Sequence, residues 1–497
     1  MAIFKKHFPL LLALIGFLVL LPYLNRPLTG QHDWNSVYFG QAARNHLRYG
    51  LLTTKLGVVT NAGFPSATLG YYTHHPILMP LMLAGSLAVF GINDWAIRLV
   101  AAVSAALLIY FLTRLSNLLY GRFTAMLVGI LLIFSPMLRY YGTIPIHETA
   151  VLGWLGLTFW AYFSWLKTSK PRFFYLTCLG LTLSQLTSWA GYYLSVYLPL
   201  YALIFSHRFF RRSWPQFTIL FVIAPIMFLL FKLHIYWLTG ASGQASLWQA
   251  FLFRVNAPSA TQIFGFNLTQ FLLLQSRWMV IYFTRISVIL GSLWLIRFIY
   301  QLIKRRPISL SVSAPLPLLI FGFTHNAIFR QQAFIHDYTL IYLLPFFALT
   351  SGIMLYQLLR LLLRRSIVAA VIFTLIVLIF FVTERRAYLQ ALYHSGDNNP
   401  AYNLSKTLNQ LTPPSAQILL LNTELMRFYD VFFNFYSDRQ ITAADNLPEN
   451  LSSLSTFDYV VIPQSHDYVT KPDRDFLYRH FAVTDTRWGQ IFTTQKL

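Results

Sequence analysis

Apolar runs alternate with short polar segments along the first three quarters of this 497-residue chain. Many of these runs are about 18 residues or longer, which is enough to cross a bilayer as a helix. The pattern therefore predicts an all-α polytopic membrane domain with roughly eleven transmembrane helices. We place them at about 8–24, 97–118, 123–141, 149–166, a tight pair that turns near 188–191 and ends at Arg208, 215–238, 278–300, 315–328, 339–359 and 366–383.

Basic residues give this set of helices an orientation. Lys and Arg cluster between the apolar runs, and such clusters mark cytoplasmic loops. Alternation from there predicts a cytoplasmic N-terminus and a C-terminus outside the membrane. The net charge of +22 is distributed over these clusters and forms no single stripe, so a nucleic-acid partner is disfavoured. The clusters are Lys5-Lys6, Lys167 to Arg172, Arg208 to Arg212, Lys304 to Arg306 and Arg360 to Arg365.

The apolar segment 76–91 is the one run that does not fit this alternation. If it crossed the membrane, every later loop would change sides and the basic clusters would face outward. The charge rule therefore predicts a re-entrant or interfacial helix inside a first outer loop at about 25–96.

The composition changes after Glu384. Short apolar stretches at 418–422 and 457–463 resemble strands, and a helical stretch at 426–436 lies between them. This alternation predicts a small extracytoplasmic α/β domain at 384–497, beside a transmembrane domain at 1–383. The chain has one cysteine, so the outer domain folds without an intrachain disulfide.

Polar residues that are costly near lipid gather in four segments, and the predicted topology brings all four to the outer side. Carboxylates, imidazoles and guanidinium groups at neighbouring helix ends predict a joint site at the membrane surface. The candidate residues are Asp33 and Arg44 in QHDWNSVYFGQAARN, His74 and His75 in YYTHHP, His147 and Glu148 in TIPIHETA, and Arg330, His336 and Tyr338 in FRQQAFIHDY.

Each residue also has a structural interpretation. Asp33 is suited to cap the helix that follows it, and Glu148 follows Pro145 in a first helical turn, where a carboxylate favours the helix dipole. Under the same structural interpretation, His336 and Asp337 are an ordinary loop pair. His74 and His75 resemble a metal pair, but adjacent histidines on a helix point to different sides. A divalent metal is therefore left open, and no residue is assigned to it.

Together the residues support one type of chemistry. Asp33 or Glu148 is suited to act as a base, and the basic groups are suited to hold an anionic phosphate. A base and a phosphate site at a lipid–water boundary predict group transfer from a lipid-linked phosphate donor to a hydroxyl.

At these residues the chain resembles the GT-C integral-membrane glycosyltransferases, in particular bacterial relatives of the dolichyl-phosphate-mannose–protein mannosyltransferases and the lipid A aminoarabinose transferases. The resemblance rests on the order of Asp33, YYTHHPILMPLMLAGSLAVFGINDWAIRLVAAVSAALL, YGRFTAMLVGILLIFSPMLRYYG and PIHETAVLGW, with HDYTLIYLLPFFAL as a weaker match. It covers about the first 200 residues well.

The resemblance implies a polyprenyl-phosphate-linked sugar donor, a site on the non-cytoplasmic face and inversion at the anomeric carbon. Asp33 is similar to the family's first-loop acid, the general base, and Glu148 to its second-loop acid. His74-His75-Pro76 replaces a Glu-Lys-Pro that is frequent in relatives, and Trp34 replaces an acid that often follows the first-loop Asp. We therefore expect a multi-pass enzyme of the inner cell membrane that modifies a lipid, glycan or protein acceptor.

Two other functions fit parts of the pattern. A transporter or flippase for lipid-linked sugars would need polar residues through the middle of the membrane, whereas here they cluster at one surface. A non-catalytic scaffold of the cell envelope would not need both Asp33 and Glu148.

Overall fold

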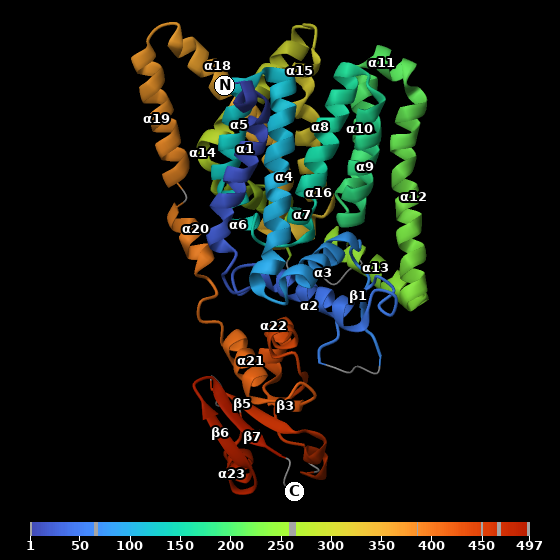
Figure 1. The fold of residues 1–497 in the computed structure, drawn as a ribbon, viewed down its shortest axis with the longest axis vertical. Coiled ribbons are helices and arrows are strands. Elements are labelled where there is room, and N and C mark those ends of the chain that lie inside the picture. The colour runs from blue at the N-terminus through green and yellow to red at the C-terminus, as the bar shows by residue number, and fades with distance from the viewer. Residues whose placement is uncertain are drawn as a thin grey trace. The chain divides into compact units, whose positions relative to one another are not determined.

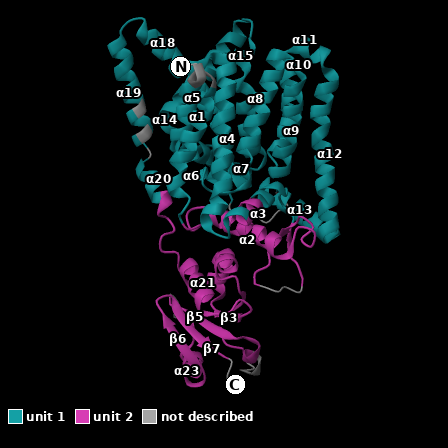
Figure 2. Cartoon of the chain, viewed as in Figure 1, with its two compact units in different colours: residues 1–26, 73–82, 89–391 teal, residues 27–72, 83–88, 392–497 magenta. Residues whose placement is uncertain are grey.

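The computed structural model describes residues 2–63, 68–257, 265–384, 386–448, 451–464 and 469–494 (Figure 1). The chain divides into two compact units (Figure 2). The first unit contains residues 1–26, 73–82 and 89–391, and the second contains 27–72, 83–88 and 392–497. Most of the predicted first outer loop therefore packs with the C-terminal residues in one unit.

The first unit is a set of packed helices. α4 packs against α1, α5 and α8, and α8 packs against α9. The bounds are α1 Ala2–Leu20, α4 Asp94–Tyr120, α5 Arg122–Phe134, α6 Pro136–Tyr141, α7 His147–Ala150, α8 Leu152–Thr168, α9 Pro171–Thr187, α10 Gly191–Phe205, α11 His207–Arg212, α12 Trp214–Thr239, α13 Ala241–Arg254, α14 Leu268–Ile303, α15 Leu310–Ser313, α16 Pro315–Ile328, α17 Arg330–Ile335, α18 Leu344–Leu363, α19 Ile367–Thr383 and α20 Arg386–Tyr393, with 3-10 turns at Leu21–Tyr23 and Asp337–Leu343.

Six helices in the described part of the chain are long and apolar enough to cross a membrane. They are Asp94–Tyr120, His147–Thr168, Trp214–Thr239, Leu268–Ile303, Asp337–Leu363 and Ile367–Tyr393, and four shorter apolar helices accompany them. The predicted number of eleven spans is not confirmed. One predicted span, 123–141, is divided at Ser135 because Pro136 begins a separate helix, α6, and cannot donate a backbone bond to α5.

The segment 239–276, which is an outer loop between the predicted spans 215–238 and 278–300, contains a helix that the sequence analysis missed. α13 begins directly after Gly240, whose φ of +65° turns the chain at the end of α12. Leu247 and Phe251 lie one helical turn apart on α13, and Arg254 ends it. Residues 258–264 of the same predicted loop lie outside the described residues. α13 is important because it carries part of the candidate site.

A tight turn joins α9 and α10 at the predicted position, 188–191. Gly191 starts α10, and a Cβ atom there would lie 2.5 Å from the carbonyl carbon of Ser184. A side chain at position 191 would therefore push the two helices apart. The close approach fixes Ser188 and Trp189, which both contribute to the candidate site described below.

The apolar segment 76–91, which did not fit the predicted alternation, forms the 13-residue helix α3, Leu78–Phe90. At about 1.5 Å per residue this helix is roughly 20 Å long, which is shorter than the ~30 Å hydrocarbon core of a bilayer. Its length therefore agrees with the predicted re-entrant or interfacial helix.

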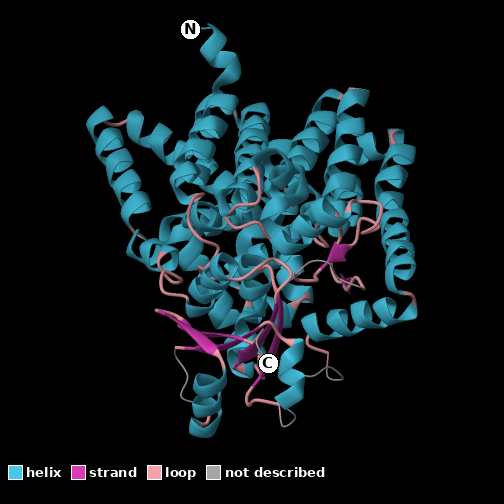
Figure 3. Cartoon of the chain, turned by 60° about the horizontal axis from the view of Figure 1, so that its bottom comes forward, coloured by secondary structure: helices cyan, strands magenta, loops and turns pink. Residues whose placement is uncertain are grey.

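The second unit contains α2 and a mixed sheet. β3 pairs in parallel with both β4 and β5, and β7 joins β5 to β6 through antiparallel pairing, in the order β4-β3-β5-β7-β6. Figure 3 draws the strands in magenta. The bounds are α2 Asp33–Tyr49, β1 Val58–Val59, β2 Tyr71–Tyr72, α21 Pro400–Leu411, β3 Gln417–Leu421, α22 Thr423–Phe432, β4 Gln440–Ala444, β5 Tyr459–Pro463, α23 Lys471–His480, β6 Ala482–Thr486 and β7 Gly489–Thr493, with single turns of other helix types at Phe433–Ser437 and Leu451–Thr456.

The two stretches predicted as strands correspond to β3 and β5, the two most buried strands of this sheet. Leu419, Leu421, Val460 and Ile462 pack with Phe492 of β7 in one apolar cluster. Parallel strands covered on both faces are rich in consecutive apolar residues, which is why the sequence signal was clear there.

His46 on α2 gives the second unit a testable pH dependence. Its side chain is buried, its Nδ1 lies 2.8 Å from Thr54 Oγ1, and burial lowers its pKa to about 4. The unfolded chain binds a proton near pH 6.5, so stability is present above that pH and is lost as pH falls toward 4. We expect a loss of up to about 3 kcal/mol.

The expected result is a melting midpoint in detergent that falls between pH 6.5 and 4 in the wild type. In a His46→Asn variant, which keeps a hydrogen-bonding atom near Nδ1 without the titration, this fall should be smaller. The same substitution at the exposed His480 should leave the fall unchanged. Equal pH profiles for wild type and His46→Asn would contradict the prediction.

Candidate functional site

Two histidine side chains from distant segments stack in the first unit. The rings of His75 and His147 are 4.3 Å apart at their centroids and tilted by only 12°. His147 is buried, and its Nδ1 lies 2.7 Å from the carbonyl oxygen of Thr187. Since a carbonyl only accepts, Nδ1 of His147 carries the proton and Nε2 of the neutral ring is left as an acceptor.

Arg254 at the end of α13 contacts the histidine pair. Its Nη2 lies 3.2 Å from His75 Nε2, and its Nη1 lies 3.5 Å from the carbonyl oxygen of His74. A guanidinium group only donates, so His75 accepts at Nε2 and is neutral. His74 is held by α13 as well, through Ser246 Oγ at 2.8 Å from its Nε2.

Burial and the neighbouring positive charge keep both adjacent histidines neutral. Desolvation lowers the pKa of His74 to about 4, and Arg254 contributes in the same direction. The pKa of His75 is lowered well below its usual value, first by desolvation and then by His147 and Arg254. At neutral pH the permanent positive charge of this cluster is therefore on Arg254.

Glu148 lies beside this cluster. Its side chain is buried, and Gln332 of α17 donates from Nε2 to its Oε1 at 3.4 Å. Tyr342, which interacts electrostatically with Glu148, has its hydroxyl 2.9 Å from Ser188 Oγ in the α9–α10 turn. Four segments that are distant in sequence thus bring a carboxylate, imidazoles and a guanidinium group together within one unit.

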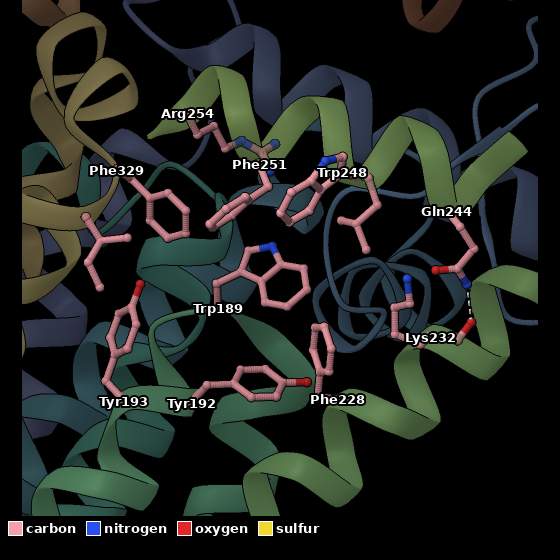
Figure 4. A pocket seen from close by; sticks show the side chains of 12 residues that line it. Trp189, Tyr192, Tyr193, Phe228, Lys232, Gln244, Trp248, Phe251, Arg254 and Phe329 are labelled. Atoms are coloured by element: carbon pink, nitrogen blue, oxygen red, sulfur yellow. Dashed lines mark hydrogen bonds between the residues drawn. The ribbon is translucent and has the colours of Figure 1, made fainter. Parts of the chain in front are cut away.

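A cavity of about 480 Å³ extends from Arg254. Figure 4 shows Trp189 in the middle of the lining, Arg254 and Trp248 along the upper edge, Tyr192 and Phe228 along the lower edge, and Lys232 and Gln244 at the right. Trp189 also donates from Nε1 to the carbonyl oxygen of His74, at 2.8 Å. An aromatic cavity that ends at a guanidinium group is suited to an apolar molecule with an anionic end.

The fourth predicted segment, 329–338, divides into separate environments. His336 stacks on Tyr338, with ring centroids 4.9 Å apart. Asp337 is buried and accepts hydrogen bonds from the hydroxyls of Tyr141 and Tyr282. Arg330 is exposed on α17 and lines a second cavity.

Asp33 and Arg44 lie in the second unit, so their meeting with the cluster around Glu148 remains a prediction. Asp33 is fully buried in the first turn of α2, and its Oδ2 accepts a hydrogen bond of 2.9 Å from the backbone N–H of Gly30. It therefore stabilises the turn before α2, and His32 occupies the cap position instead. This bond uses one of the two carboxylate oxygens.

Arg44 has a structural partner that the sequence did not reveal. It forms an ion pair with Asp438 at 3.3 Å and donates to the carbonyl oxygen of Phe435 at 2.7 Å, with its guanidinium group over the Phe435 ring. Burial lowers the pKa of Arg44, and Asp438 opposes this shift. Its predicted role in phosphate binding therefore has to compete with an existing carboxylate.

No group of three or more His, Cys, Asp or Glu side chains within the described ranges is arranged to hold a metal ion. The guanidinium group of Arg254, which contacts His75, favours an anion over a cation at this position. The two residues that the sequence analysis missed are Arg254 and Gln332. Both belong to helices that begin within or just after segments interpreted as outer loops.

Residues 74–237 match the model of the family described as dolichyl-phosphate-mannose-protein mannosyltransferase. A comparison with curated protein sequences gives no match. The family match includes His74, His75, His147 and Glu148 but ends before Arg254.

Solved structures share the fold over nearly the whole chain. ArnT from Cupriavidus metallidurans bound to undecaprenyl phosphate is 12% identical, with 98% of each chain covered and a TM-score of 0.65. The apo oligosaccharyltransferase of Archaeoglobus fulgidus is 14% identical, with 100% of this chain and 76% of that chain covered and a TM-score of 0.58. AglB from Archaeoglobus fulgidus, in complex with an inhibitory peptide and a dolichol-phosphate, is 12% identical, with 99% of this chain and 75% of that chain covered and a TM-score of 0.57. The resemblance seen in the sequence is thus confirmed: residues 74–237 match the mannosyltransferase family model, and the chain shares the fold of ArnT and of the archaeal oligosaccharyltransferase.

Proposed function

We propose that this protein is an inverting glycosyltransferase that moves a sugar from a polyprenyl-phosphate donor to an acceptor hydroxyl on the outer face of the membrane. The observation that carries the proposal is the position of Arg254, which lies against His75 at the end of an aromatic cavity. Glu148, which follows His147 in the chain, supplies a buried carboxylate in the same unit. ArnT and AglB, which share the fold, were solved with undecaprenyl phosphate and a dolichol-phosphate.

In this proposal the cavity takes the apolar chain of the donor, and Arg254 holds its phosphate. Trp189, Trp248 and Phe251 offer apolar and aromatic surface to the isoprenoid units. The guanidinium group donates to phosphate oxygens and compensates the charge that develops when the phosphate leaves. His75 contacts this guanidinium group through Nε2 and helps to fix its position.

The reaction needs a base as well as a phosphate site. The acceptor oxygen attacks the anomeric carbon opposite the phosphate, a new C–O bond forms, and the C–O bond to the phosphate breaks. The acceptor proton passes to a carboxylate, for which the family resemblance favours Asp33, with Glu148 assisting. We infer a location in the inner cell membrane from this resemblance, and the basic clusters favour a cytoplasmic N-terminus.

Binding of polyprenyl phosphate to the purified protein tests the phosphate site. Replacing Arg254 by Gln should weaken binding about ten- to hundredfold, because a charge-assisted hydrogen bond contributes roughly 1.5–3 kcal/mol. The unphosphorylated polyprenol should bind both proteins equally. The measurement is a titration in detergent that follows intrinsic tryptophan fluorescence, since Trp189 and Trp248 line the cavity.

Lys232→Gln is the matched control, because Lys232 lines the same cavity away from Arg254 (Figure 4). It should change the affinity for polyprenyl phosphate less than about twofold. If Lys232→Gln lost more affinity for polyprenyl phosphate than Arg254→Gln, the phosphate would lie near Lys232 and the assignment to Arg254 would be refuted. Mass spectrometry of lipid-linked sugars in cells lacking the protein would then identify the sugar from the donor that accumulates.

A further inference from the structure

A second cavity lies next to the one described above. It has a volume of about 620 Å³ and shares two lining residues, Phe251 and Ile328, with the aromatic cavity. These two side chains therefore form a common wall between the cavities. A molecule in the second cavity would be a neighbour of a donor in the first.

Two buried amide side chains line this second cavity. Asn326 is 4% exposed and Gln275 is 6% exposed. Neither the oxygen nor the nitrogen of the Asn326 amide has a hydrogen-bond partner among the described residues, and the same holds for Gln275 Oε1. Gln275 Nε2 donates to the carbonyl oxygen of Ala333 at 2.7 Å, which fixes the direction of that amide. Buried polar atoms without partners are rare, and both residues line a space that can hold a ligand.

The rest of the lining indicates which class of ligand fits. Leu268, Leu272 and Ile328 are 62%, 53% and 39% exposed, so the cavity opens on an apolar surface of the helices. A ligand would therefore enter from lipid and carry an apolar chain. Arg330, also at the cavity, is exposed and permanently charged, which favours an anionic group on the ligand.

We propose that the second cavity binds the acceptor, and that the acceptor is a membrane amphiphile with an anionic, hydroxylated head group. The proposal rests on the proposed function, because it assigns the first cavity to the donor. Arg330 holds the anionic group, and Asn326 and Gln275 bind head-group hydroxyls, each of which both donates and accepts. One hydroxyl attacks the anomeric carbon of the donor, gives its proton to the carboxylate, and releases the polyprenyl phosphate.

Lipid capture in nanodiscs tests this assignment. The protein is placed in nanodiscs with equal amounts of phosphatidylcholine and phosphatidylglycerol, of which only the second has an anionic head group with free hydroxyls. A photocrosslinker at Leu272, as Leu272→p-benzoylphenylalanine, should capture phosphatidylglycerol over phosphatidylcholine by about threefold or more. The same replacement at Leu375, which is also 53% exposed but lies on α19, should capture the two lipids in their bulk ratio.

Two substitutions in the Leu272 crosslinking protein identify the groups responsible. Asn326→Leu and Arg330→Gln should each reduce the preference toward the bulk ratio. Asn326→Leu removes a buried amide without a partner among the described residues, so the folded protein should persist, and its melting midpoint checks this. Equal capture at Leu272 and Leu375, or a preference that survives both substitutions, would overturn the proposal.

Added polyprenyl phosphate separates this proposal from the one on which it rests. It should not displace phosphatidylglycerol from Leu272, and displacement would show that the second cavity belongs to the donor. If Arg254→Gln leaves polyprenyl-phosphate binding unchanged while the lipid preference at Leu272 persists, the donor assignment is wrong. The lipid site in the second cavity is then still supported.

Discussion

Replacing Asp33 by Asn should lower sugar transfer by about three orders of magnitude while leaving the fold and donor binding unchanged. Removal of a general base typically costs about 10²- to 10⁴-fold in rate. The amide oxygen of the introduced asparagine can still accept the hydrogen bond that Asp33 Oδ2 receives from the N–H of Gly30. The substitution therefore removes the negative charge and the basicity but keeps the turn before α2. The measurement is the single-turnover rate with saturating polyprenyl-phosphate sugar in proteoliposomes.

Asp94→Asn is the control for a purely structural effect. Asp94, like Asp33, lies in the first turn of a helix, where a carboxylate favours the helix dipole by roughly 0.3–1 kcal/mol. Its replacement should reduce the melting midpoint slightly and leave the transfer rate unchanged. If Asp33→Asn behaves like Asp94→Asn, with a small loss of stability and full transfer, Asp33 is a helix-end residue and another group is the base.

The apolar helices were predictable because length and hydropathy determine whether a segment can cross a membrane. The prediction for 315–328 coincides with α16, and that for 366–383 differs from α19 by one residue. α13 was missed because its Gly, Ser and aromatic residues resemble a loop in composition. Leu247, Phe251 and Arg254 follow each other at helical spacing and line the same cavity, and that periodicity was the available signal.

The site was predictable only in part, since its chemistry depends on contacts between distant segments. His75, His147 and Glu148 were identified from their position at helix ends, and the structure brings the first two into a stack. The partner of Arg44 could not be identified, because Asp438 lies almost 400 residues away in the chain. Arg254 was missed for the same reason, since only its contact with His75 distinguishes it from other basic residues.

Replacing Glu148 by Gln should lower transfer by about a hundredfold, with a smaller effect on donor binding. Gln332 donates to Glu148 Oε1, and the amide oxygen of the introduced glutamine could still accept that bond, so the substitution changes the charge more than the geometry. If Glu148 assists the reacting groups, the loss should appear in kcat and not in KM. Measurement at saturating and limiting donor concentrations separates the two.

Gln332 provides the control for this prediction, because its side chain contacts Glu148 but has no proposed part in the reaction. Gln332→Leu should misplace the carboxylate and lower transfer by about tenfold, whereas Gln332→Glu would add a second negative charge beside Glu148 and weaken phosphate binding as well. If Glu148 only interacted favourably with the helix dipole, Gln332→Leu would not lower transfer and Gln332→Glu would not weaken phosphate binding. Full activity in both Glu148→Gln and Gln332→Leu would therefore mean that Glu148 stabilises the helix end, and that its position next to His147 in the chain has no catalytic consequence.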